Sequence, residues 1–166
     1  MNKGLELIEA MRLYGLPAEQ VTAVIHRQSI VHSLVEFRDG AMLAQLGVPD
    51  MRIPIQLALT YPTRQENPAA GLDLLTCGPL TFDAPDLDVF PCLRLAMEAA
   101  RAGGTACPVL NGANEAAVAL FLQEKIGFYD IPARVSRALE TVPFVAKPSL
   151  PEILAADAAA RRAAEL

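Results

Sequence analysis

The sequence has no tryptophan, only three cysteines, and fewer basic than acidic residues. Its 14 Lys and Arg residues are outnumbered by 19 Asp and Glu residues, which gives a formal net charge of −5 at pH 7. Proteins that bind nucleic acid through phosphate contacts present a basic surface. The charge balance therefore predicts no nucleic-acid partner.

Long apolar runs are absent as well. A membrane-spanning helix needs roughly 18 apolar residues in succession, and charges, prolines or glycines interrupt every apolar run of this chain. Glu6 stands where the apolar core of a secretory signal would begin. We therefore expect no membrane partner and a cytoplasmic location.

The three cysteines form no close pair. Cys77, Cys92 and Cys107 are widely separated, and no two cysteines are spaced as in a zinc site or a disulfide framework. Buried thiols in a reducing compartment are the simplest interpretation.

What the chain does have is enough apolar material for a core. Of its 166 residues, 52% are hydrophobic and 20% are charged, which excludes a disordered chain. Apolar residues at helical spacing predict a first helix that ends near Leu16-Pro17, and the β-branched run at 21–25 predicts a strand.

A hairpin is predicted next, with strands at 29–38 and 41–46 around Asp39-Gly40. A two-residue turn there would place Phe37 opposite Met42, Val35 opposite Ala44 and Ser33 opposite Leu46. These residues would form an apolar face towards the core. The other face mixes polar and apolar side chains, which is typical of a binding cleft or a subunit contact.

The remaining residues predict helices. Asp50 is expected to cap a helix that stops at Tyr61-Pro62, and a proline-rich connector without periodicity follows. Four further helices are expected at about 88–102, 112–125, 130–142 and 149–166, with caps at Asp88 and Asp130 and a capping box from Ser149 to Glu152. Short loops would join them into an antiparallel bundle. The prediction is an α+β chain with domains at 1–62 and 87–166 and a linker at 63–86.

Asn2, Lys3 and Glu6 form the best candidate site. Offsets of three and four residues place these side chains together at the N-terminus of a helix, where anions are attracted. An amide and an ammonium group suit a phosphate, and a carboxylate suits a divalent cation. The alternative is an ordinary solvated Lys3–Glu6 pair, which the spacing alone favours.

Two other polar groups are weaker candidates. His26 and His32 would lie roughly 20 Å apart on one strand, so a single ion cannot bind both, and each is most simply a hydrogen-bonded histidine. Asn111, Asn114 and Glu115 are the only polar concentration in the C-terminal half, and helix capping is the expected explanation.

Several segments are distinctive when they are taken in order along the chain: Asn2–Glu6, Ile25–Ser33, Asp39-Gly40, Leu43–Pro54, Leu80–Phe82, Phe90–Ala96 and Leu110–Glu115. Together they resemble the 1-deoxy-D-xylulose 5-phosphate reductoisomerase family over essentially the whole chain. The resemblance implies part of a catalytic domain with a β-hairpin-containing sheet, followed by a linker and a C-terminal four-helix bundle. It also implies an enzyme of non-mevalonate isoprenoid biosynthesis that converts 1-deoxy-D-xylulose 5-phosphate to 2-C-methyl-D-erythritol 4-phosphate with NADPH and Mg²⁺ or Mn²⁺.

The resemblance also implies roles for individual residues. Asn2 and Lys3 match contacts to the substrate phosphate, and Glu6 matches a catalytic, metal-binding carboxylate that also touches substrate. The polar residues that line the pocket are matched by Ser29 and His32, and a residue near the nicotinamide is matched by Met51. Arg27 departs from the family, which usually has proline at this position of the turn.

Two hypotheses follow. The first is a C-terminal fragment of this reductoisomerase, expected to be inactive alone because the nucleotide domain and the other metal ligands would lie upstream. The alternative is a non-catalytic dimerisation or binding module derived from the enzyme. In both cases a homodimer through the hairpin sheet is expected, because uncovered sheet edges and apolar patches favour association.

Overall fold

The computed structural model describes residues 1–166 and divides them into two compact units. The first unit combines Met1–Ala23 with Pro85–Leu166, and the second is Val24–Ala84. Helices dominate the first unit and a two-stranded antiparallel sheet lies in the second, so the α+β prediction is confirmed. No helix is both long enough and apolar enough to span a membrane.

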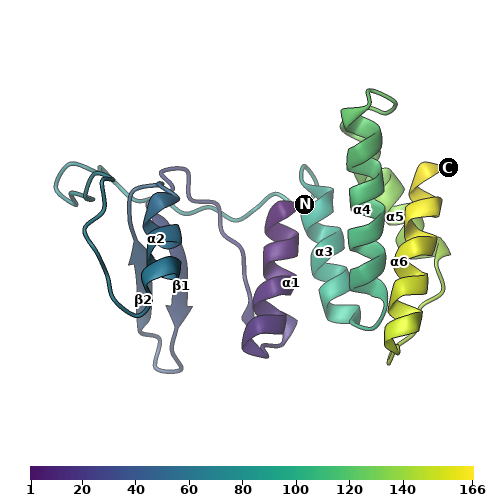
Figure 1. Ribbon diagram of the computed structural model, residues 1–166, viewed down its shortest axis with the longest axis horizontal. Helices are drawn as coiled ribbons and strands as arrows, with labels where there is room; N and C mark the ends of the chain where they lie inside the picture. The colour runs from purple at the N-terminus through teal and green to yellow at the C-terminus, as the bar shows by residue number, and fades with distance from the viewer. The chain divides into compact units, whose positions relative to one another are not determined.

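The first unit is a helical bundle with the first helix of the chain added to it (Figure 1). Its elements are α1 (Asn2–Tyr14), the short 3₁₀ helix η1 (Ala18–Gln20), α3 (Pro91–Ala102), α4 (Ala106–Leu122), α5 (Asp130–Thr141) and α6 (Leu150–Glu165). Leu110 of α4 and Val135 of α5 are fully buried at its centre. Many of the remaining core residues are alanines, which let the helix backbones approach closely.

Helix α1 packs on α3 (Figure 1), with Gly4 directly against Ala96 and with Met1, Leu5 and Ile8 against the bundle core. The sequence placed α1 with the hairpin and put breaks at 62/63 and 86/87, whereas the compact units divide at 23/24 and 84/85. The physical reason is that the apolar stripe of α1 is buried by bundle helices.

The helix boundaries differ from the predictions at several caps. Helix α4 begins at Ala106 instead of 112, because Pro108 lies in its first turn, where proline is tolerated. The cap of α3 is Phe90 and not Asp88, and Asp130 is the first residue of α5 and not its cap. The capping box is confirmed, since the carboxylate of Glu152 accepts the Ser149 N–H at 2.7 Å.

The second unit contains β1 (Val31–Glu36), β2 (Met42–Leu46) and α2 (Arg52–Thr60). The expected strand at 21–25 is absent, and only Ile25 forms a bridge, to Asp83. Helix α2 ends at Thr60, directly before Tyr61-Pro62 as expected. Residues 63–86 contain no helix or extended strand, and those up to Ala84 belong to the compact second unit.

The predicted hairpin forms, but its register is shifted by one residue. Val35 pairs with Leu43 and Glu36 pairs with Met42. The loop is one residue longer than expected, because the Phe37 N–H donates to the Ala41 carbonyl at 2.8 Å and Gly40 takes a left-handed φ of +83°. An Asp-Gly pair suits this three-residue loop as well as a two-residue one.

The register shift changes the two faces of the hairpin. A slip of one residue moves side chains to the opposite face, so Val35 and Leu43 share one face while Leu34 and Ala44 share the other. The expected apolar core face is therefore wrong. Large apolar side chains are exposed on both strands and in the loop: Leu34, Val35, Phe37, Met42, Leu43 and Leu46.

Candidate functional site

The three side chains at the start of α1 come together as the spacing predicted. The Asn2 amide donates to Glu6 Oε1 at 2.5 Å, and Lys3 Nζ forms an ion pair with Glu6 Oε2. The Lys3 and Glu6 side chains are 60% and 43% exposed, so the group is open to solvent. Lys3 offsets the charge of the carboxylate and Asn2 hydrogen-bonds to it, which are contacts that an ordinary surface group would also make.

The chain does not by itself provide a complete metal site. Glu6 offers one carboxylate of the kind that hard cations prefer, but no group of three His, Cys, Asp or Glu side chains is placed to hold an ion. Nor does the sequence contain a glycine-rich dinucleotide fingerprint. The residues present therefore cannot by themselves complete a site for Mg²⁺ or Mn²⁺, or a binding site for NADPH. Further ligands from outside this chain would be needed.

Ser29 lies in the second unit, at the end of a tight turn just before β1. The Ser29 N–H donates to the His26 carbonyl at 3.2 Å and closes the turn. Ser29 is exposed and has a φ of +52°, a left-handed conformation that is uncommon outside glycine.

His32 is an exposed residue of β1, and its ring reaches the end of β2. His32 Nε2 lies 3.2 Å from the Gly47 carbonyl, so it is the donor in this hydrogen bond. Ile30, between Ser29 and His32, is buried and anchors the segment. Both polar side chains thus belong to one short stretch fixed by an apolar residue.

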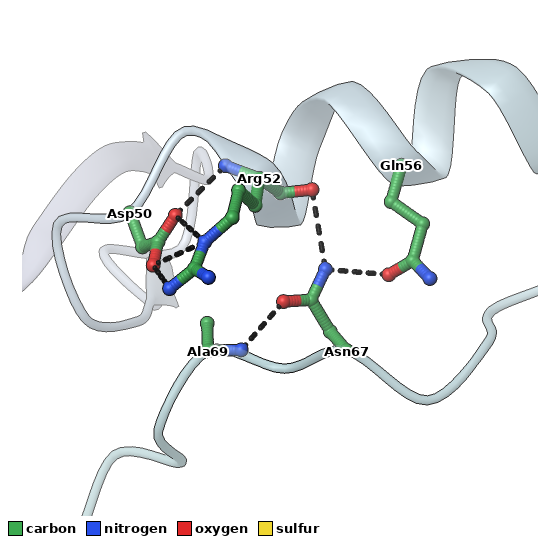
Figure 2. Close-up of polar contacts among 5 residues, drawn as sticks. All are labelled: Asp50, Arg52, Gln56, Asn67 and Ala69. Atoms are coloured by element: carbon green, nitrogen blue, oxygen red, sulfur yellow. Dashed lines mark hydrogen bonds and ion pairs between the residues drawn. The ribbon is translucent and has the colours of Figure 1, made fainter.

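Met51 lies at the start of α2, between two residues that bind each other. The carboxylate of Asp50 accepts the backbone N–H of Arg52 at 2.9 Å and also accepts from its guanidinium at 2.5 Å (Figure 2). Hydrogen bonds from the Arg52 side chain lower the pKa of Asp50 to about 2. Met51 itself is 70% exposed, so its thioether is free for contact.

The connector is tied to the same end of α2 through Asn67 (Figure 2). The Asn67 amide donates to the Arg52 carbonyl at 3.2 Å and to Gln56 Oε1 at 2.5 Å. Its own oxygen accepts the Ala69 N–H at 2.9 Å. No periodic pattern in the sequence indicated this contact.

Sequence reasoning also missed a polar cluster around Thr81. Gln28 and Thr81 bind each other through both side chains, and His26 Nδ1 lies 2.8 Å from the Thr81 carbonyl. The ring of His26 stacks on Phe82, with centroids 4.6 Å apart. The only available signal was the resemblance of Leu80–Phe82 to the family.

The capping interpretation of Asn111, Asn114 and Glu115 is wrong, because all three lie within α4. The Asn111 amide donates to Glu115 at 3.0 Å, and Arg161 of α6 donates to Glu115 at 2.7 Å. The Arg161 hydrogen bond lowers the pKa of Glu115. Arg161 also binds Asp157 of its own helix, so the group links α4 to α6.

Together these features define an α+β protein with a helical bundle, a hairpin unit and a solvent-exposed polar group at the start of α1. A family model described as the DXP reductoisomerase C-terminal domain matches residues 46–163. The chain belongs to this family.

Named relatives agree with this assignment. The 1-deoxy-D-xylulose 5-phosphate reductoisomerase of Xanthomonas oryzae pv. oryzae (strain PXO99A) is 57% identical over 99% of this chain, which covers 42% of that relative. The enzyme of Acetivibrio thermocellus is 53% identical over 99% of the chain and is covered to 43%. The chain thus spans less than half the length of these relatives.

Solved structures of the family have the same fold. The reductoisomerase from Zymomonas mobilis in complex with NADPH matches with a TM-score of 0.88 and 48% identity, over 99% of this chain and 43% of that one. A DOX-P reductoisomerase in complex with magnesium matches with a TM-score of 0.89 at the same identity and the same two coverages. Another, with fosmidomycin and magnesium, has a TM-score of 0.86 and the same coverages.

Proposed function

We propose that this chain supplies the C-terminal part of a 1-deoxy-D-xylulose 5-phosphate reductoisomerase. The enzyme would convert this phosphorylated sugar to 2-C-methyl-D-erythritol 4-phosphate with NADPH and Mg²⁺ or Mn²⁺ in non-mevalonate isoprenoid biosynthesis. The observation that carries the proposal is 57% identity to a named reductoisomerase over 99% of the chain. Within that enzyme, residues 1–62 would belong to the catalytic domain, 63–86 to the linker and 87–166 to the C-terminal helical domain.

Asn2 and Lys3 would bind the substrate phosphate at the positive end of α1. In the free chain both donate to Glu6. A phosphate dianion would compete for the same two donors and would leave the Glu6 carboxylate with uncompensated charge. That charge would favour a divalent cation on Glu6, so phosphate and cation binding would support each other.

Ser29 and His32 would hydrogen-bond the sugar, and Met51 would pack against the nicotinamide. The exposed hydroxyl, ring and thioether of these residues suit such contacts. When bound, NADPH supplies the hydride and the metal ion polarises substrate oxygens. Because positioning of the reacting groups supplies much of the barrier reduction, this chain alone should not oxidise NADPH.

The proposal includes a cytoplasmic location and a homodimer formed through the exposed hairpin. The large apolar side chains of β1 and β2 would be covered by the same surface of a second copy. Nucleic acid and membranes are not expected as partners.

The test is a hybrid enzyme in which this chain follows the upstream residues of the Xanthomonas oryzae relative. We expect the hybrid to consume NADPH with 1-deoxy-D-xylulose 5-phosphate and Mg²⁺, and the chain alone to be inactive. Glu6→Gln should lower kcat/KM of the hybrid about 100-fold or more, above the cost of losing an outer-shell partner of a metal. Glu9→Gln, on the same helix, is the control and should have little effect.

A metal titration of the isolated chain tests whether Glu6 needs metal ligands from the rest of the enzyme. In the chain alone, one carboxylate should bind Mn²⁺ no more tightly than the roughly millimolar range of weak oxygen sites. A micromolar site that Glu6→Gln abolishes in the isolated chain would contradict the proposed need for upstream ligands.

The second candidate is a non-catalytic dimerisation or binding module. The exposed apolar side chains of the hairpin favour it, because such patches mark interaction sites. A hybrid that folds and dimerises but stays inactive with substrate, NADPH and metal would support this candidate over the enzyme.

A further inference from the structure

The backbone of Ser29 is unusual for a residue of its type. Its φ of +52° lies in the left-handed region, which serine has little intrinsic tendency to occupy. Such conformations persist when the surrounding structure fixes them, and they cluster at functional sites. The question is therefore which contacts hold Ser29 in this conformation.

The turn that leads into Ser29 is held by a residue far along the chain. The Gln28 amide donates to Thr81 Oγ1 at 2.9 Å, and Gln28 Oε1 accepts from the Thr81 hydroxyl at 3.2 Å and from its backbone N–H at 3.3 Å. Gln28 is the residue directly before Ser29. Rotation of the Ser29 peptide would strain or break these contacts.

The other end of the turn is held by the same segment. His26 Nδ1 donates to the Thr81 carbonyl at 2.8 Å, since a carbonyl can only accept. The ring also stacks on Phe82. Ile25 and Asp83 exchange two backbone hydrogen bonds, at 2.8 and 2.9 Å. Residues 25–28 are therefore bound on both sides of the turn to residues 81–83.

We propose that Thr81 and Gln28 are positioning residues for Ser29. The Thr81 hydroxyl holds the Gln28 side chain, and the turn between His26 and Ser29 then presents the Ser29 hydroxyl to the sugar phosphate. This inference rests on the proposed function, because it takes Ser29 as a substrate contact. It gives the C-terminal end of the connector a role in substrate affinity.

The variants that test this proposal differ by one hydroxyl or one methyl group. Thr81→Val keeps the shape of the side chain and removes both of its hydrogen bonds to Gln28, whereas Thr81→Ser retains the hydroxyl. Thr76→Val is the matched control in the same connector, because the Thr76 hydroxyl bonds only to the nearby Asp73 carbonyl, at 3.4 Å.

The first measurement uses the 166-residue chain and does not depend on catalysis. Nuclear magnetic resonance couplings and carbon shifts of Ser29 report its φ. We expect a left-handed Ser29 in the parent chain, in Thr81→Ser and in Thr76→Val, and its loss or averaging in Thr81→Val. A fully left-handed Ser29 in Thr81→Val would overturn the proposal.

The second measurement uses the hybrid enzyme described above. Thr81→Val should raise KM for the sugar phosphate about five- to tenfold with kcat nearly unchanged, which is the loss expected for one or two ordinary hydrogen bonds used in uniform binding. Thr81→Ser should restore KM. An equal KM change in Thr76→Val, or a fall in kcat alone, would overturn the proposal. An inactive parent hybrid would refute the proposed function instead. The measurement of the Ser29 φ would then decide by itself whether Thr81 and Gln28 position Ser29.

Discussion

Arg27 occupies a position in its turn that favours proline. The turn runs from His26 to Ser29, and neither Arg27 nor Gln28 has a positive φ, which excludes type II and fits type I geometry. Proline suits the second residue of such a turn, and the Arg27 N–H makes no backbone hydrogen bond that would be lost. The backbone of this turn could therefore hold a proline in place of Arg27.

We predict that Arg27→Pro stabilises the second unit by about 0.4–1 kcal/mol, because proline restricts the unfolded chain. Denaturant-dependent hydrogen exchange of the β1 and β2 amides would measure this change. Arg27→Ala is the control, since it removes the guanidinium group without fixing φ. A loss of stability in the proline variant would show that the turn is not type I.

Gly112 is a second position where a single substitution should change stability, because there is no room for a Cβ atom. A Cβ at this residue of α4 would lie 2.5 Å from Asp157 Oδ1 and 2.9 Å from the Asp157 carbonyl of α6. We predict that Gly112→Ala destabilises the bundle by about 1–3 kcal/mol, the usual cost of overpacking, despite the better helix propensity of alanine. Thermal unfolding followed by circular dichroism would measure it. Gly71→Ala, with open space around its Cβ position, should be near neutral.

Contacts between near neighbours in sequence could be predicted, and distant ones could not. The Asn2–Lys3–Glu6 group follows from helical spacing alone. The Thr81 contact joins residues 53 positions apart, and nothing in local periodicity encodes it. The left-handed Ser29 was missed for the same reason, because a serine carries no signal for positive φ.

At the scale of whole elements, the sequence-based predictions were wrong in helix boundaries and in the register of the hairpin. Helical periodicity located every helix of the bundle, but α4 begins at Ala106, before the predicted start at about 112, with Pro108 in its first turn. The hairpin was found from Asp39-Gly40, yet the loop length was not. One residue of loop length decides which side chains share a face, so the predicted hairpin core was lost with it.

The start of α6 should respond to acid. Hydrogen bonds from the Ser149 side chain and backbone lower the pKa of Glu152 from its ordinary 4.5. A carboxylate with a lowered pKa in the folded state contributes stability above its unfolded pKa, and that contribution is lost as pH falls through the folded value. We expect the melting temperature to fall as the pH drops below about 4.5, the ordinary pKa of this carboxyl group.

Glu152→Gln tests the source of this dependence. The variant should unfold at a lower temperature than the parent at pH 7 and should lose less of its melting temperature on acidification. Glu165→Gln, at the other end of α6, is the control. An unchanged acid profile in Glu152→Gln would assign the dependence to other carboxylates, such as Glu115, whose pKa is also lowered.

For the molecule as a whole, self-association is the property easiest to test. We expect light scattering to give a mass above the 17.8 kDa of one chain. Leu43→Lys places a charge on a β2 side chain that is 64% exposed and should shift the mass towards the monomer. Leu154→Lys introduces the same charge on α6, where the side chain is 62% exposed, and should not. A monomer at all concentrations would contradict association through the hairpin.

The docking of α1 on α3 has a consequence for synthesis of the chain. Helix α1 leaves the ribosome before α3, the helix that buries its apolar stripe, because α3 lies beyond the entire second unit. At ordinary translation rates this delay is on the order of ten seconds. During that time Leu5 and Ile8 lack their partners in the bundle core, whereas the second unit can close as soon as Asp83 emerges to meet Ile25. The nascent helix is thus a candidate substrate for chaperones, and slower translation of residues 24–84 would lengthen its exposure.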